Sequence, residues 1–129
     1  MAVSGWSYGG YMTTWLLGNY PEKWKAAVSG AAVTDFLDQY NLGDANVRRG
    51  AAFGGSPYTD AGRAAEYLKQ SPIDYATRIK APTLILSDTG DFRVPVTQSY
   101  RLFHALSDNG VTTQFIASTC TRSLPVRIQ

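Results

Sequence analysis

Gly5-Trp6-Ser7-Tyr8-Gly9-Gly10 is the stretch that decides the fold, because it sets a serine between glycines where a strand meets a helix. The short apolar run Ala2-Val3 precedes it and a helix-compatible segment, residues 11–17, follows it. A serine hydroxyl becomes a useful nucleophile only when it is exposed and aimed, and a sharp strand-to-helix turn does this. We expect small residues at positions 5 and 9 because a Cβ there would clash. The pattern predicts Ser7 as a nucleophile and leaves the N–H of Tyr8 free to bind an oxyanion.

A second motif, Asp91-Phe92-Arg93-Val94-Pro95, follows the strongly apolar segment 82–87. In open α/β sheets, ligands bind outside the carboxyl ends of the strands, where a carboxylate can orient a catalytic imidazole. The order of serine and then aspartate matches the chain order Ser…Asp…His of one hydrolase class. Two alternatives stay open: an ordinary glycine turn around Ser7, and solvated turn residues at Asp88 and Asp91. The aromatic residues Trp6, Tyr8 and Tyr11 either line a substrate pocket or pack in the core.

Composition limits the other classes of function. The chain has 129 residues, of which 44% are hydrophobic and 17% charged, as in a single globular domain. A net charge of +2 is too small to indicate nucleic-acid binding. No apolar run reaches the roughly 18 residues that span a bilayer, and the N-terminus lacks the basic region of a signal peptide. The single cysteine, Cys120, forms no internal disulfide, and no Cys/His cluster indicates a metal. We expect a cytoplasmic protein that binds no metal, cofactor, membrane or nucleic acid.

Hydrophobic periodicity predicts strands that alternate with helices. The predicted strands cover residues 1–4, 25–30, 82–87 and 112–117, and the predicted helices cover residues 8–19, 61–70, 71–76 and 95–108. Residues 34–55 are rich in Asp, Asn and Gly and are predicted to form a loop with one short helix. Residues 118–129 show no clear period and are predicted to be a tail. This alternation predicts an α/β fold with about four mostly parallel strands and helices mainly on one face.

The motifs also resemble those of a known family. The stretch from Gly5 to Met12 resembles the active-site signature of prolyl oligopeptidase-type serine peptidases, including the dipeptidyl-peptidase and acylaminoacyl-peptidase branches. Ser71-Pro72 with residues 79–85, and the D-x-R-V-P-x-x-Q-S segment at residues 91–99, are similar to the same family, so the resemblance runs from residue 2 to about residue 117. It implies an α/β-hydrolase domain in which Ser7 is the nucleophile, Tyr8 supplies an oxyanion N–H and Asp91 is the triad acid.

Two departures from the family pattern shape the expected activity. In the family, strands and helices that precede the nucleophile turn (residues 5–10 here) complete the oxyanion hole. We therefore expect a truncated α/β-hydrolase, with residues 1–117 as a partial domain and residues 118–129 as an unrelated tail. The family's catalytic histidine follows the last strand, and residues 118–129 contain none. His104, the chain's one histidine, falls opposite the apolar stripe of its helix and is predicted at the surface. It could serve as a substitute base only after rearrangement or from another subunit.

The sequence therefore predicts a serine hydrolase, esterase-like or peptidase-like, that forms an acyl-enzyme on Ser7. Its activity is expected to be weak and limited to small activated esters, because their leaving groups need little protonation. The alternative is an inactive hydrolase fragment that acts as an oligomerising or interaction module. A parallel sheet covered on one face only, with an open edge at residues 2–4, is expected to form a homo-oligomer through that face or edge.

Overall fold

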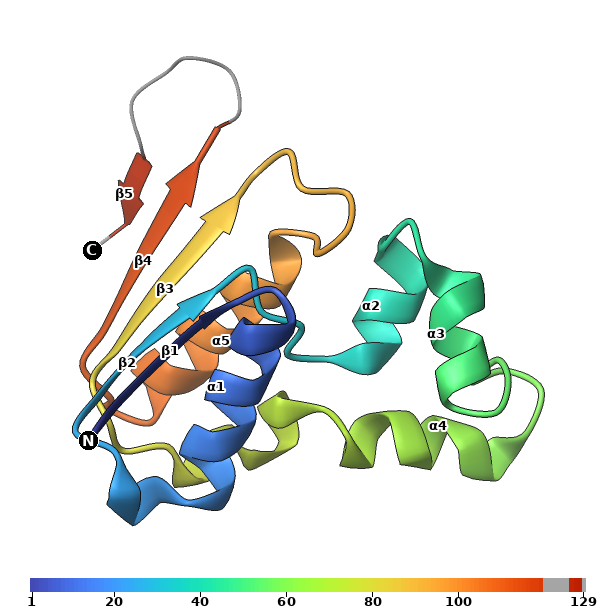
Figure 1. Cartoon of the computed structure of the whole chain (residues 1–129), viewed down its shortest axis with the longest axis horizontal. Helices are drawn as coiled ribbons and strands as arrows, with labels where there is room; N and C mark the ends of the chain where they lie inside the picture. Colours follow the sequence, from blue (N-terminus) through green and yellow to red (C-terminus); the bar gives the residue numbers. More distant parts are fainter. Residues whose placement is uncertain (120–125, 129) are drawn as a thin grey trace.

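A computed structural model describes residues 1–119 and 126–128 of the chain. Its centre is a sheet with the strand order β1-β2-β3-β4-β5 (Figure 1). Strands β1 to β4 are parallel, and β5 pairs antiparallel with β4. The strands are β1 (Ala2–Trp6), β2 (Ala26–Gly30), β3 (Thr83–Asp88), β4 (Thr113–Ser118) and β5 (Val126–Ile128). The predicted α/β fold with four parallel strands is confirmed. The sequence did not predict β5, because three residues are too few to show a period.

Helices connect the strands, mostly at the predicted positions. They are α1 (Tyr8–Asn19), α2 (Phe36–Leu42), α3 (Asn46–Ala52), α4 (Ala61–Lys69) and α5 (Thr97–Asp108), with 3₁₀ turns η1 (Pro21–Lys23) and η2 (Pro72–Arg78). Helix α1 has the predicted bounds. Residues 34–55, predicted as a loop with one short helix, hold two helices, α2 and α3. Each has seven residues, which is too short to show a strong helical period.

The two faces of the sheet differ in how far helices cover them. One face carries the paired row Gly5, Ser29, Ile85 and Phe115. On this face Thr14 of α1 hydrogen-bonds Ser29 (Oγ1 to Oγ, 2.9 Å), and the ring of Tyr100 of α5 meets Phe115. Helices α1 and α5 therefore cover the same face (Figure 1). The core lies between them and the sheet and includes Leu17, Ile85, Leu102, Leu106 and Phe115.

The opposite face carries the row Trp6, Gly30, Leu86 and Ile116. Trp6 lies over Gly30 and is 57% exposed, while the Leu86 and Ile116 side chains are only partly buried. Within the described residues, β1 pairs only with β2, so it forms one edge of the sheet. In the same described part of the chain, no helix has the length and apolar character to cross a membrane.

Candidate active site

Ser7 occupies a strained turn between β1 and α1. Its φ is 58° and its ψ is −117°, in a region that residues with a side chain rarely adopt. The Ser7 N–H donates to the carbonyl oxygen of Gly30 (2.9 Å), and its own carbonyl accepts from the N–H of Tyr11 (3.0 Å). Strand β2 and the first turn of α1 thus hold the serine in this conformation.

Two close backbone approaches shape the turn. A Cβ at Gly5 would lie 2.3 Å from the carbonyl oxygen of Gly9, and a Cβ at Gly10 would lie 2.3 Å from that of Gly30. A Cβ at Gly9 would meet nothing within 4 Å. The sequence-based expectation of a clash is confirmed for position 5 and wrong for position 9, because the Gly9 Cβ direction points into open space. The steric demand lies instead at Gly10, where α1 crosses the end of β2.

The N–H of Tyr8 lies at the start of α1 and has no acceptor among the hydrogen bonds of the described residues. The first turn of α1 also carries no acidic side chain that would offset the positive end of the helix dipole. A free donor at a helix N-terminus, next to the serine hydroxyl, can bind the negative charge of a tetrahedral intermediate. The position of the Tyr8 N–H therefore suits the oxyanion role that the sequence indicates.

Asp91 lies in the loop after β3, at the carboxyl-terminal end of the parallel strands, where Ser7 also lies. Its Oδ1 accepts the N–H groups of Arg93 (2.8 Å) and Val94 (2.9 Å), which fixes the carboxylate within the turn. Ser7 follows β1 and Asp91 follows β3, and β2 lies between these strands. Neighbouring strands are about 4.8 Å apart, so β1 and β3 are about 10 Å apart. The structure thus brings both predicted residues to the same end of the sheet, and one strand, β2, lies between the strands that carry them.

His104 lies elsewhere. It is exposed on α5 and its ring contacts that of the neighbouring Phe103, with centroids 5.5 Å apart. Helix α5 begins after the Asp91 loop and leads away from it, and seven residues of helix cover about 10 Å. In the described part of the chain, no hydrogen bond joins His104 to Ser7 or Asp91. The predicted surface position is confirmed, and the role of substitute base stays a hypothesis.

A cavity of about 620 Å³ opens beside Ser7. It is lined by residues from four helices and the loop after β2: Ser7, Tyr8, Tyr11, Val33, Phe36, Ala52, Phe53, Glu66 and Gln70. Of the three aromatic residues singled out in the sequence, Tyr8 and Tyr11 line this cavity, whereas Trp6 lies on the other face of the sheet. The six residues from Val33 onward were missed, because only the tertiary fold brings α2, α3 and α4 to the serine.

Aromatic rings form the wall of the cavity. Tyr11 lies between Tyr8 (5.6 Å between centroids) and Phe36 (5.3 Å), and Phe36 lies 5.0 Å from Phe53. Burial raises the pKa of the Tyr11 hydroxyl, and the nearby Tyr8 and Tyr75 raise it further. Tyr11 therefore stays protonated at neutral pH and can donate a hydrogen bond to a bound ligand.

Both the sequence and the fold of the chain are similar to those of known proteins. A family model described as "Prolyl oligopeptidase family" matches residues 1–120. An acylamino-acid-releasing enzyme of Arabidopsis thaliana is 34% identical over 116 residues, which are 86% of this chain and 15% of that protein. The Homo sapiens enzyme of the same name is 30% identical over 132 residues, covering 99% of this chain and 16% of that protein.

A solved structure of an acylaminoacyl peptidase from Pyrococcus horikoshii superposes with a TM-score of 0.80 and 30% identity, covering 95% of this chain and 19% of that one. A puromycin-hydrolyzing peptidase of Mycobacterium tuberculosis gives a TM-score of 0.76 with 26% identity, covering 92% and 18%. The chain spans about a sixth of the length of the curated relatives that it matches.

Proposed function

The chain belongs to the prolyl oligopeptidase family of serine peptidases, and on this premise we propose that Ser7 is the nucleophile of a hydrolase that forms an acyl-enzyme. The observation that carries the proposal is the strained Ser7 turn, which opens into the aromatic cavity. The Ser7 Oγ attacks the substrate carbonyl, and the leaving group departs with the hydroxyl proton. Water then cleaves the acyl-enzyme ester and returns a proton to Ser7. The Tyr8 N–H stabilises the oxyanion, and Asp91 would serve as the acid of a triad.

The rate of the proposed hydrolysis depends on a group that accepts the proton of the Ser7 hydroxyl. The chain's one histidine, His104, lies exposed on α5, so no imidazole accompanies Ser7 among the described residues. Oxyanion stabilisation and substrate binding alone still support residual catalysis. We therefore propose weak hydrolysis restricted to small activated esters, whose leaving groups need little protonation. The cytoplasmic location and the domain boundary at residue 117 stay predictions.

The first test is covalent labelling of Ser7. A fluorophosphonate probe is expected to add one phosphonyl group to the chain, and mass spectrometry of the peptides should locate it on Ser7. Ser7→Ala should lose both this adduct and the hydrolysis of a p-nitrophenyl ester. Ser107→Ala, which removes an exposed hydroxyl from α5, is the matched control and should behave like the parent chain. Equal ester hydrolysis by Ser7→Ala and the parent chain would exclude Ser7 as the nucleophile.

A second candidate function is supported by the uncovered sheet face. Trp6, Leu86 and Ile116 form an apolar row there, and β1 offers an unpaired edge within the described residues. Parallel sheets are normally covered on both faces, and open edges pair with other chains. On this reading the chain is an inactive module that assembles into a homo-oligomer through that face or edge.

Light scattering tests the assembly. We expect a mass above that of the 14.1 kDa monomer at micromolar concentration, decreasing on dilution. Ile116→Lys places a charge in the apolar row of the uncovered face and should shift the protein to monomer. Leu42→Lys, on the exposed side of α2, should not. A parent chain that remains monomeric at high concentration would contradict the proposal, whereas an oligomer that Ile116→Lys leaves intact would assign assembly to the β1 edge.

A further inference from the structure

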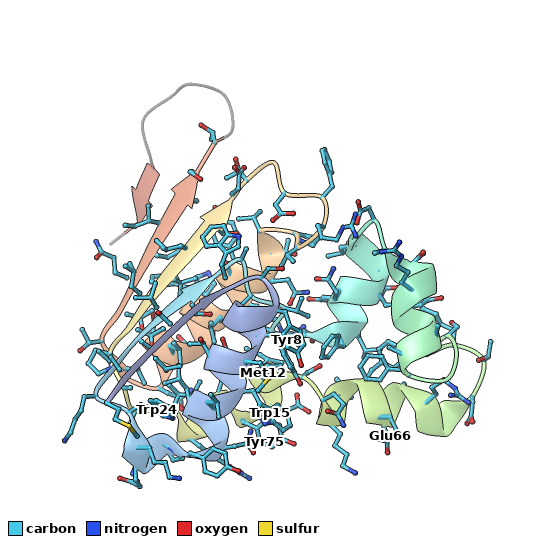
Figure 2. All side chains as sticks on the ribbon, viewed as in Figure 1. Tyr8, Met12, Trp15, Trp24, Glu66 and Tyr75 are labelled. Atoms are coloured by element: carbon cyan, nitrogen blue, oxygen red, sulfur yellow. The ribbon has the colours of Figure 1, made fainter. Side chains whose placement is uncertain are left out.

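We propose that the buried side chain of Gln98 positions one wall of the cavity beside Ser7, and so sets how tightly the cavity holds the side chain of an acyl group. The inference deepens the proposed hydrolase function and rests on it for the assignment of the cavity to the acyl group. Gln98 is 0% exposed and acts through the loop after β2, which leads to the cavity-lining Val33 and Phe36. Tyr8 of α1, labelled in Figure 2, lines the same cavity from the side of the serine.

The loop after β2 needs support from other segments. Residues 31–35 are all buried and form neither helix nor strand. Buried backbone N–H and C=O groups require hydrogen-bond partners, which a segment without regular structure does not supply by itself. The carbonyl oxygen of Thr34 accepts the N–H of Ile73 in η2 (3.0 Å). The N–H groups of Thr34 and Asp35 have their acceptor on α5.

That acceptor is the side-chain amide of Gln98, which holds the loop with both of its ends. Its Oε1 accepts the N–H groups of Thr34 (2.8 Å) and Asp35 (2.8 Å), and its Nε2 donates to the carbonyl oxygen of Asp35 (2.9 Å). The Thr34 hydroxyl lies 2.9 Å from the backbone carbonyl oxygen of Gln98 and 3.0 Å from Oε1. A backbone N–H only donates and a backbone C=O only accepts, so these partners fix the orientation of the amide.

Helix α5 gives this amide a rigid base. Gln98, Leu102 and Leu106 are spaced by four residues and are each 0% exposed, so they share one buried side of the helix. Leu102 and Leu106 belong to the core that packs against the sheet. Because α5 follows the loop that carries Asp91, Gln98 also connects that loop to the wall of the cavity.

The segment that Gln98 holds is bordered on both sides by residues of the cavity wall. Val33 precedes Thr34-Asp35 and Phe36 follows it, and both line the cavity. The Phe36 ring contacts those of Tyr11 (5.3 Å between centroids) and Phe53 (5.0 Å), so its position sets the spacing of the aromatic wall. Release of the segment would let this wall move, and a ligand would then have to order it on binding, which lowers the affinity.

Binding of two amides to the full chain tests the inference. N-acetyl-phenylalanine methylamide and N-acetyl-alanine methylamide differ by one phenyl group, and NMR titration gives both dissociation constants. We expect the parent chain to bind the phenylalanine amide about tenfold more tightly, because the cavity removes its ring from water. Gln98→Met keeps the size of the side chain, removes its hydrogen bonds and should reduce this ratio to about twofold. The ratio does not depend on how much of the protein is folded, since both ligands bind the same folded population.

Leu106→Ala is the control for a loss of stability alone. It opens the core at the other end of α5, so it should lower the melting temperature and keep the tenfold ratio. Thr34→Val removes the hydroxyl that contacts Gln98 and should reduce the ratio by about twofold. This milder variant tests the same contact if Gln98→Met does not fold.

Three results would overturn the inference: a parent chain that does not prefer the phenylalanine amide, a ratio that Gln98→Met and Thr34→Val leave unchanged, or a ratio that Leu106→Ala lowers as much as Gln98→Met. Fluorophosphonate labelling tests Ser7 separately. Labelling of Ser7 without an effect of Gln98 on the ratio rejects the positioning role alone. A ratio that depends on Gln98, without labelling of Ser7, rejects the hydrolase function alone.

Discussion

Gly5→Ala is expected to lower the free energy of unfolding by about 3 kcal/mol and to abolish labelling of Ser7. The added Cβ would lie 2.3 Å from the carbonyl oxygen of Gly9, 2.4 Å from its carbonyl carbon and 2.8 Å from its Cα. These are backbone atoms, which cannot rotate away as a side chain can. Relief of the clash requires the start of α1 to move away from β1, and that movement alters the φ and ψ that present Ser7. Urea denaturation followed by circular dichroism measures the stability.

Gly9→Ala is the internal comparison for stability. It adds the same methyl group in the first turn of α1, where nothing lies within 4 Å. Because alanine favours a helix over glycine by up to about 1 kcal/mol, this variant should be as stable as the parent or more stable. Gly10→Ala should resemble Gly5→Ala, since its Cβ would lie 2.3 Å from the carbonyl oxygen of Gly30. Similar stabilities for Gly5→Ala and Gly9→Ala would show that the turn relaxes and that its steric description is wrong.

The parts of the fold that sequence predicts well are those whose signals are local. Helix α1 follows directly from the Ser7 turn and ends before Pro21, so both of its bounds are marked in the sequence. Strand β3 is a continuous apolar run, and Asp91 lies in a turn directly after it. Ser7 and Asp91 reach the same end of the sheet because parallel strands place their carboxyl ends together, which is a property of the topology.

The parts that sequence misses depend on tertiary contacts. Helices α2 and α3 are short, and their rings gain partners only from other segments: Phe36 meets Tyr11 of α1, and Phe53 stacks on Tyr67 of α4. Glu66 looks like any exposed helical glutamate, because nothing within α4 shows that it lines the same cavity as Ser7. The error at Gly9 has the same origin, since the atoms that occupy the space around a glycine belong partly to other elements.

Asp35→Ala is expected to lower the free energy of unfolding by about 3 kcal/mol, because one carboxylate holds the start of α2 in three ways. Asp35 is 2% exposed. Its Oδ1 caps α2 by accepting the N–H groups of Leu37 (2.7 Å) and Asp38 (3.1 Å), and its Oδ2 pairs with Arg101 of α5. The backbone of Asp35 is fixed as well, since Gln98 accepts its N–H (2.8 Å) and donates to its carbonyl (2.9 Å).

A series of variants separates these contributions. Asp35→Asn retains a capping oxygen and loses the charge, so it should cost about 1 to 2 kcal/mol, less than Asp35→Ala. Asp38→Ala removes the second carboxylate that pairs with Arg101 (3.0 Å), but both of these side chains are solvent-accessible and the cost should stay below about 1 kcal/mol. Because the Arg101 side chain is 48% exposed, water screens its pair with Asp35, and the cap with its buried acceptor should account for most of the loss.

The same series tests how the cavity is built. Val33 and Phe36, which line the cavity, flank the Thr34-Asp35 segment that Gln98 binds. The N–H of Phe36 also donates to the Oγ of Ser71 (2.8 Å), so hydrogen bonds of this segment connect α2 to α5 and to the start of η2. Asp35→Ala should therefore slow fluorophosphonate labelling of Ser7 more than Asp38→Ala does, at temperatures where both variants remain folded. Stability loss without a change in the labelling rate would mean that the aromatic wall holds Phe36 in place independently of the cap.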